Sequence, residues 1–148
     1  MEVTKLLKSD HQKVKDLFSK AMPKGEVDTD IVQEICSALT LHMEAEEKLV
    51  YPEAEQIKAS EELAQESYEE HHQAKGLIRK LESGKLDEIE FKVTFEMLQL
   101  AIEHHVEEEE SELFPVLREK FSAQELAELG EKVEEFKEQK HQKRKTKS

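Results

Sequence analysis

The sequence contains little of what β-sheets, disulfides and membrane spans require. Only four glycines and three prolines occur in 148 residues, which leaves too few turns for a protein built of strands. The single cysteine, Cys36, has no partner for an internal disulfide, which fits a reducing compartment. No apolar run approaches the roughly 20 residues of a membrane span, and residues 1–10 are rich in charge. We therefore expect a soluble, cytoplasmic, all-α protein.

Basic residues are also scarce. Lys and Arg together number 22 against 35 Asp and Glu, which gives a formal net charge of −13. Because nucleic acid binding needs a basic surface, we expect no nucleic acid partner and, without a span, no membrane partner. The length is that of one domain, and only residues 137–148 reverse the charge balance. We predict a helical domain over residues 1–136 and a basic, flexible tail over 137–148.

Four long stretches repeat apolar residues at helical spacing, and each is bounded by capping or breaking residues. They begin near residues 4, 28, 60 and 87, and a short fifth helix begins near 122. Pro23 and Gly25 end the first, and Pro52 marks a kink or an end in the second. Asp87 with Glu90 resembles a capping box at the start of the fourth. The pattern predicts a four-helix bundle.

Histidine and glutamate interrupt the apolar stripes of all four helices. The six polar residues at apolar positions are His11, His42, Glu46, His71, His105 and Glu109. One histidine on an apolar face is usually a hydrogen-bonded core residue, so no single position is informative. An ionised carboxylate in a dry core, however, costs several kcal/mol unless it is paired or binds a metal. No Lys or Arg lies on these stripes, so the set as a whole predicts a metal site.

An internal repeat supports this interpretation. In each half of the chain a proline follows the HxxxE histidine by ten residues, at Pro52 and at Pro115, and an aromatic residue precedes it. Asp10-His11 in the first half likewise matches Glu70-His71 in the second. Two such hairpins packed about an approximate two-fold axis would bring four histidines and two glutamates to one point in the core, which is a dinuclear site.

The neighbouring polar residues are expected to have other roles. Most of the adjacent acids face outward by helical phase and are predicted to be solvated; these acids are Glu44, Glu47, Glu107, Glu108 and Glu110. His72 and His104 lie about 100° around their helices from the candidate ligands. We expect them at the surface or just outside the site, and only secondarily as ligands.

The doubled HxxxEE motif, each followed by an aromatic residue and proline, resembles the hemerythrin family, in particular bacterial hemerythrin-like HHE cation-binding proteins. The resemblance covers about residues 3–120. It implies an up-down-up-down four-helix bundle that holds two non-heme iron ions, bridged by carboxylates and an oxo or hydroxo group, and that binds dioxygen, nitric oxide or peroxide. Carried over by position, His11 and His42 would hold one iron and His71 and His105 the other. Glu46 and Glu109 would bridge them.

Two departures from the oxygen carriers affect the expected function. Lys75 stands where those proteins have a further histidine, and the last motif is HxxxE rather than HxxxxD. With fewer protein ligands, each metal would keep an open coordination position. Three alternative functions are consistent with this: a protein that binds or senses the small ligand, a di-iron oxidase or peroxide-consuming enzyme, or an iron-responsive or iron-storage module. Zinc is a chemically acceptable alternative metal. The sequence assigns no catalytic residue and leaves the oligomeric state open.

Overall fold

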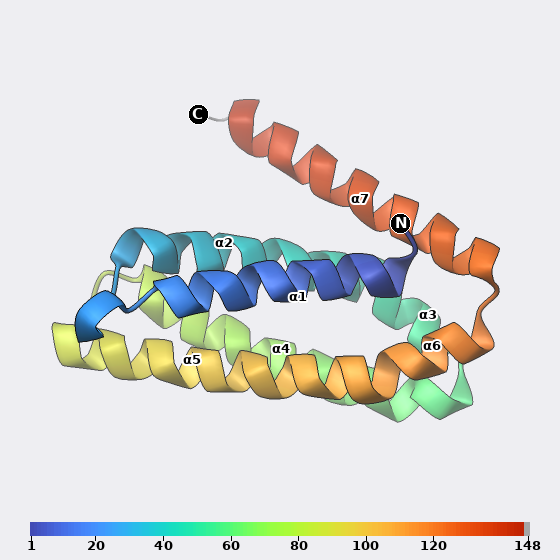
Figure 1. Cartoon of the computed structure of the whole chain (residues 1–148), viewed down its shortest axis with the longest axis horizontal. Helices are drawn as coiled ribbons and strands as arrows, with labels where there is room; N and C mark the ends of the chain where they lie inside the picture. Colours follow the sequence, from blue (N-terminus) through green and yellow to red (C-terminus); the bar gives the residue numbers. More distant parts are fainter. Residues whose placement is uncertain (147–148) are drawn as a thin grey trace.

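A computed structural model of the chain describes residues 1–146, and it is a bundle of four antiparallel helices with a fifth lying across it (Figure 1). The four bundle helices are α1 (Val3–Lys20), α2 (Thr29–Ala45), α4 (Lys58–Glu82) and α5 (Glu88–Glu108). α1 pairs with α2 and α4 pairs with α5, as two successive hairpins. The described residues contain no strand, so the prediction of an all-α four-helix bundle is confirmed.

Asp28 and Asp87, which the sequence predicts as capping residues, precede the first residues of α2 and α5. Asp28 accepts hydrogen bonds from the amides of Asp30 and Ile31 at 3.0 and 3.3 Å. Asp87 accepts from the Glu90 amide at 2.8 Å, while the Glu90 carboxylate accepts from the Asp87 amide at 3.1 Å. Each cap satisfies amides that have no partner inside their own helix. These caps fix where α2 and α5 begin, and so fix the register of their inward-facing residues.

α2 and α5 both widen at the same point of the repeat. A π-helical turn follows each, at Glu46–Val50 and at Glu109–Leu113. The short helices α3 (Tyr51–Glu55) and α6 (Phe114–Lys120) come next, each with its proline at the second position. Proline has no amide hydrogen and displaces the preceding carbonyls, and a wider turn accommodates this. The kink expected at Pro52 is therefore present, and it recurs at Pro115.

The apolar core is divided into two clusters with a polar layer between them. One cluster lies toward the α1–α2 and α4–α5 turns and includes Phe18, Ile35 and Phe95. The other lies under α7 and includes Leu7 and Leu117. On every bundle helix the candidate histidine falls between residues of the two clusters. The candidate ligands are therefore enclosed by apolar packing on both sides.

The fifth helix, α7 (Ala123–Thr146), is longer than the sequence suggested. It begins after Ser122, which forms a capping box with Glu125, and it continues through most of the basic segment. Gly130 packs against the start of α1, where a Cβ would lie 2.1 Å from the Met1 carbonyl oxygen. The division of the chain at residue 136 stays a prediction. None of the helices within residues 1–146 combines the length and the apolarity needed to cross a bilayer.

Candidate metal centre

The six residues predicted from the stripes lie together in the buried layer. All six are buried, and the two glutamates are 0% and 1% exposed. Their donor atoms form two groups in which all atoms lie within 4.8 Å of one another. One group contains His11, His42, Glu46 and Glu109, and the other contains Glu46, His71 and His105. The predicted convergence is therefore present in the structure, whereas metal ligation by these residues stays a prediction.

Each glutamate lies between histidines of both hairpins. Glu46 Oε1 is 3.0 Å from His42 Nε2 and 3.2 Å from His71 Nε2. Glu109 Oε1 is 3.2 Å from His11 Nε2 and 3.3 Å from His105 Nε2. A carboxylate in contact with one imidazole from each hairpin has the placement that a bridging ligand requires.

The four histidines all present Nε2 to the interior because a carboxylate holds each Nδ1 on the outer side. The Nδ1–carboxylate pairs are His11–Glu110 at 2.8 Å, His42–Asp10 at 2.9 Å, His71–Glu47 at 2.8 Å and His105–Glu70 at 2.7 Å. A carboxylate at Nδ1 fixes the ring orientation and makes the opposite nitrogen a better metal ligand. Metal-binding histidines typically have such a partner.

These outer contacts repeat the two-fold symmetry of the chain and correct one prediction. Asp10 and Glu70, which directly precede the first histidine of each hairpin, orient the second histidine of the same hairpin. Glu47 and Glu110 orient the first histidine of the other hairpin. Both were predicted among the outward-facing, solvated acids; they are partly exposed, but each also orients a histidine, which was not predicted. The signal was present in the repeat itself, because the acidic pair EE occurs at the same place in both halves.

Tyr51 was not predicted as part of the site. Its hydroxyl donates to Glu109 Oε2 at 2.6 Å, and Glu46 Oε1 lies 3.1 Å away. The same oxygen is 3.1 Å from His71 Nε2 and 3.3 Å from His105 Nε2. Burial raises the pKa of Tyr51 well above its usual value, and the two carboxylates raise it further, so the phenol is neutral and can donate.

The two-fold symmetry is broken at this position. Phe114 takes the place of Tyr51 in the second half of the repeat, and its ring stacks on His11 with centroids 5.8 Å apart. Only the half of the site formed by His71 and His105 therefore has a hydroxyl in contact with its imidazoles. The half formed by His11 and His42 is closed by a phenyl ring, so the two candidate metal positions differ chemically.

Within the described part of the chain, four buried side-chain donor and acceptor atoms have no hydrogen-bond partner. They are His11 Nε2, His42 Nε2, Glu46 Oε2 and Glu109 Oε1. His11 Nε2 and Glu109 Oε1 lie 3.2 Å apart, and His42 Nε2 lies 3.0 Å from the other Glu46 oxygen, Oε1; both distances suit ion pairs, but neither contact is aligned as a hydrogen bond. Each buried unsatisfied polar atom costs about 1–3 kcal/mol. A cation would engage all four, and a set of imidazole nitrogens and carboxylate oxygens suits iron or zinc.

The charges of the site follow from the same contacts. Burial alone would lower the pKa of His42, but the adjacent Glu46 carboxylate outweighs it and the net pKa is raised. For His105 burial is likewise outweighed, by Glu109, and the pKa is raised well above its usual value. Burial would raise the pKa of Glu46, yet its histidine neighbours, His42 first, hold it well below the usual range. Metal entry must therefore displace protons from the imidazoles.

The remaining predicted neighbours lie outside the buried layer. Lys75 is one-third exposed and its ammonium group contacts the two oxygens of Glu47 at 2.7 and 2.9 Å. It supports the outer carboxylate of His71 rather than entering the site. His72 is exposed. His104 is 66% exposed and pairs with Glu108 at 3.0 Å, so both histidines lie where the sequence predicted.

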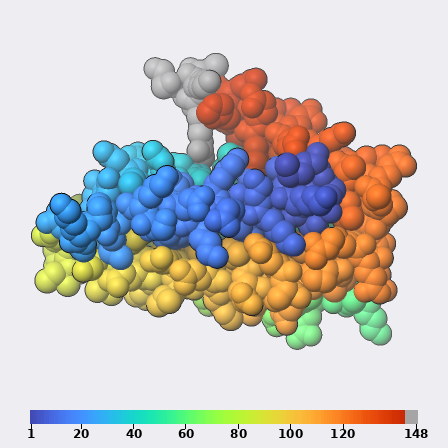
Figure 2. Space-filling view, viewed as in Figure 1, coloured from blue at the N-terminus to red at the C-terminus, as the bar shows by residue number. Residues whose placement is uncertain are grey.

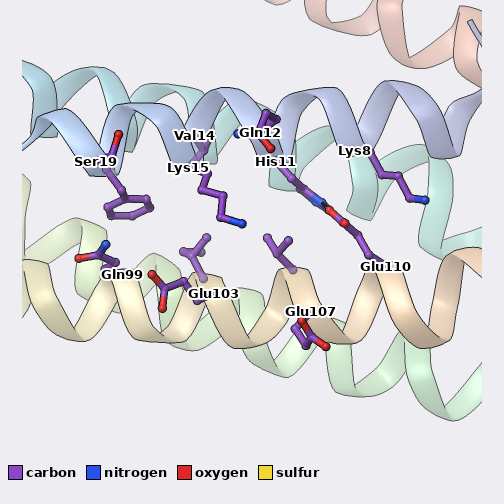
Figure 3. Close-up of a pocket in the computed structure, with 13 residues that line it drawn as sticks. Lys8, His11, Gln12, Val14, Lys15, Ser19, Gln99, Glu103, Glu107 and Glu110 are labelled. Carbon is purple, nitrogen blue, oxygen red and sulfur yellow. Dashed lines mark hydrogen bonds and ion pairs between the residues drawn. The ribbon is translucent and has the colours of Figure 1, made fainter.

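A groove between α1 and α5 leads to the site (Figure 3). Its volume is about 680 Å³, and its lining includes Val14, Ile102 and His11. His11 contacts Glu110 across it. Beside the groove lies a cavity of about 10 Å³, and His11, His42, His105 and several apolar side chains line it. That volume is about the size that one water molecule needs. The groove and the cavity share His11, Val14 and Ile102 in their linings, so these side chains separate the groove from the buried imidazoles.

Comparison with known proteins agrees with this geometry. The family described as "Hemerythrin HHE cation binding domain" matches residues 2–117. A DNA nickase from Nostoc sp. is 30% identical over 128 residues, which are 84% of this chain and 36% of that protein. An uncharacterized hemerythrin-like protein from Schizosaccharomyces pombe is 26% identical over 132 residues, which are 86% of this chain and 65% of that protein. The chain thus spans less than two thirds of both relatives, and no solved structure matches it significantly.

The matched residues include all six candidate ligands and both π-helical turns. Buried clusters of histidine and glutamate in such a domain fit a metal-binding site. The chain therefore belongs to the hemerythrin family, as an HHE cation-binding domain.

Proposed function

We propose that the buried layer binds two iron ions and through them a small ligand such as dioxygen, nitric oxide or peroxide. His11 and His42 would hold one ion, His71 and His105 the other, and Glu46 and Glu109 would be shared. The observation that carries the proposal is the set of buried, unsatisfied nitrogen and oxygen atoms that face one another between the two hairpins. Apolar packing does not explain why polar atoms are buried here without hydrogen-bond partners.

Iron, when bound, supplies a position for the small ligand and exchanges electrons with it. The protein residues determine where this takes place. Tyr51 fills the space beside His71 and His105. Its oxygen lies close enough to both imidazole nitrogens to act as a further metal ligand there. Beside His11 and His42, Leu39 and Ile102 leave the small cavity below the groove. We therefore assign ligand entry to the half of the site formed by His11 and His42.

The same proposal favours a small-molecule partner over nucleic acid. One relative is named a DNA nickase, but this chain spans only 36% of that protein. The net charge of −13 opposes the approach of a phosphate backbone. The groove reaches the buried imidazole of His11, and the cavity beside the other imidazoles has room only for a ligand of a few atoms.

Metal analysis after loading the purified chain with ferrous iron under anaerobic conditions tests the proposal. We expect about two ions per chain, and optical bands of oxidised iron after exposure to air. Glu46→Gln should lower occupancy, whereas Glu107→Gln, on the exposed side of α5, should not. A single tightly bound ion would refute the paired site. Steady-state consumption of oxygen or peroxide by the loaded protein would select an enzyme over a reversible binding protein.

A further inference from the structure

The outer face of α5 carries an apolar stripe that nothing in the described structure covers. Ile89, Val93, Met97 and Leu100 are 77%, 51%, 51% and 67% exposed. Apart from Met1, they are the exposed large hydrophobic residues of the described chain. The space-filling view shows α5, coloured yellow to orange, along the surface of the molecule (Figure 2). A soluble helix that is apolar on both faces is expected to be buried on both.

The four residues form one continuous face. Their spacings of four, four and three place them within about 80° of one another around the helix. The core side chains of α5, such as Phe95 and Ile102, lie on the opposite side. Exposed apolar surface of this extent, on the order of 300–600 Å², commonly marks an interaction site. The stripe thus lies on the face of α5 opposite the candidate metal ligands, so the role of the stripe does not depend on metal binding.

The order of residues along the stripe suits a second copy of the same helix in antiparallel orientation. A two-fold axis near residue 95 would place Ile89 opposite Leu100 of the partner and Val93 opposite Met97 of the partner. Both pairings then occur twice, as a symmetric dimer requires. Apolar residues meet along the whole stripe in this register.

The charges beside the stripe agree with that orientation. Lys92 and Glu96 are exposed on the same edge of it, and neither makes an ion pair within residues 1–146. In an antiparallel pair of helices each edge faces its own counterpart, so Lys92 of one copy would lie beside Glu96 of the other, twice. A parallel pair would instead bring this edge against the opposite edge of the stripe, so that Lys92 of one copy and Glu96 of the other would lie on different sides of the interface.

We propose that α5 forms an antiparallel, two-fold symmetric interface with α5 of a second copy of this chain. α7 packs on α1 and α2 and leaves the outer face of α5 open. The stripe is smaller than the roughly 800 Å² per partner of a standard stable interface. The dimer is accordingly weak and reversible, and forms in the micromolar range or above.

Sedimentation of the full chain from low micromolar to millimolar concentration tests this proposal. We expect a monomer–dimer equilibrium that Val93→Glu abolishes, because it places a charge in the centre of the interface. Lys92→Glu and Glu96→Lys should each weaken the dimer by roughly five- to tenfold. The double variant that combines them should restore it, whereas Lys13→Glu on α1, the same charge change elsewhere, should have no effect. Circular dichroism checks that each variant is folded.

A chain that stays monomeric over the whole concentration range would overturn the proposal. So would a dimer that survives Val93→Glu with unchanged affinity. A double variant as weak as the single ones would refute the antiparallel pairing, because only that arrangement brings the two charges together.

Discussion

The hydroxyl of Tyr51 gives the sharpest test of how the buried layer is held together. Tyr51→Phe removes one oxygen atom and leaves the ring in place. The matching position of the repeat already holds Phe114, so a phenyl ring fits this environment. What is lost is the hydrogen bond of 2.6 Å to Glu109 and the contacts with Glu46 and two imidazoles.

The size of the effect follows from the charge of the acceptor. A buried hydrogen bond to a charged group contributes about 1.5–3 kcal/mol. We therefore expect Tyr51→Phe to lower the free energy of unfolding of the metal-free protein by that amount. For a domain of this length it corresponds to a fall of roughly 3–12 °C in Tm. Thermal unfolding of chelator-treated protein, followed by circular dichroism, measures it.

Tyr68→Phe provides the matched control. Its hydroxyl makes a long bond of 3.4 Å to the Glu47 carbonyl oxygen and also faces the Glu55 carboxylate, but it is only partly buried. We therefore expect a smaller change, below about 1 kcal/mol. If Tyr51→Phe were no more destabilising than this control, the hydroxyl would not hold Glu109 in place. Tyr51 would then not make the two halves of the site unequal.

Four further outcomes are expected. Loading the protein with ferrous iron should raise Tm well above that of the chelator-treated form, because the metal binds the folded state alone; equal values would contradict the buried site. Glu47→Gln should weaken metal binding about 10–100-fold, because it orients a histidine without being a ligand, and competition with a chelator should show no such loss for Glu107→Gln. The metal-free protein should lose stability as the pH rises through the folded-state pKa values of His42 and His105. Both are raised above the usual 6.5, so their contribution is complete below about 6.5 and disappears above the raised values; a stability that rises across that range would disprove it. Gly130→Ala should destabilise the packing of α7 on α1, because the added Cβ meets the Met1 carbonyl oxygen, and limited proteolysis should then cleave α7 faster than in the parent.

The six candidate ligands were predictable because a regular helix fixes which residues share a face. His42 and Glu46 lie one turn apart on the stripe of α2, and the structure buries both. Three residues whose roles were missed, Glu47, Tyr51 and Glu110, lie in or directly after the π-helical turns, where the helix stops being regular. The π-helical turn begins at Glu46, so the helical phase of later residues changes.

Tyr51 illustrates the change. It follows Glu46 by five residues, which in an α-helix points it about 140° away from the site. A π-helical turn closes between residues five apart, so Tyr51 faces the same way as Glu46. The extent of α7 was missed for another reason. Its last residues are mainly Lys, Gln and Glu, which favour helix, whereas the density of positive charge there favours a flexible tail.

Glu47 and Glu110 each contact a histidine of the other hairpin, and these contacts affect how the protein folds. Within each hairpin one histidine is oriented locally, His42 by Asp10 and His105 by Glu70. The other is oriented only after docking, because His11 depends on Glu110 and His71 on Glu47. Local hairpins form early in folding, but neither contains a complete, oriented set of donors. A metal ion bound at these residues would therefore find its complete set of oriented donors only after the hairpins join, and it would favour correctly docked chains over half-assembled ones.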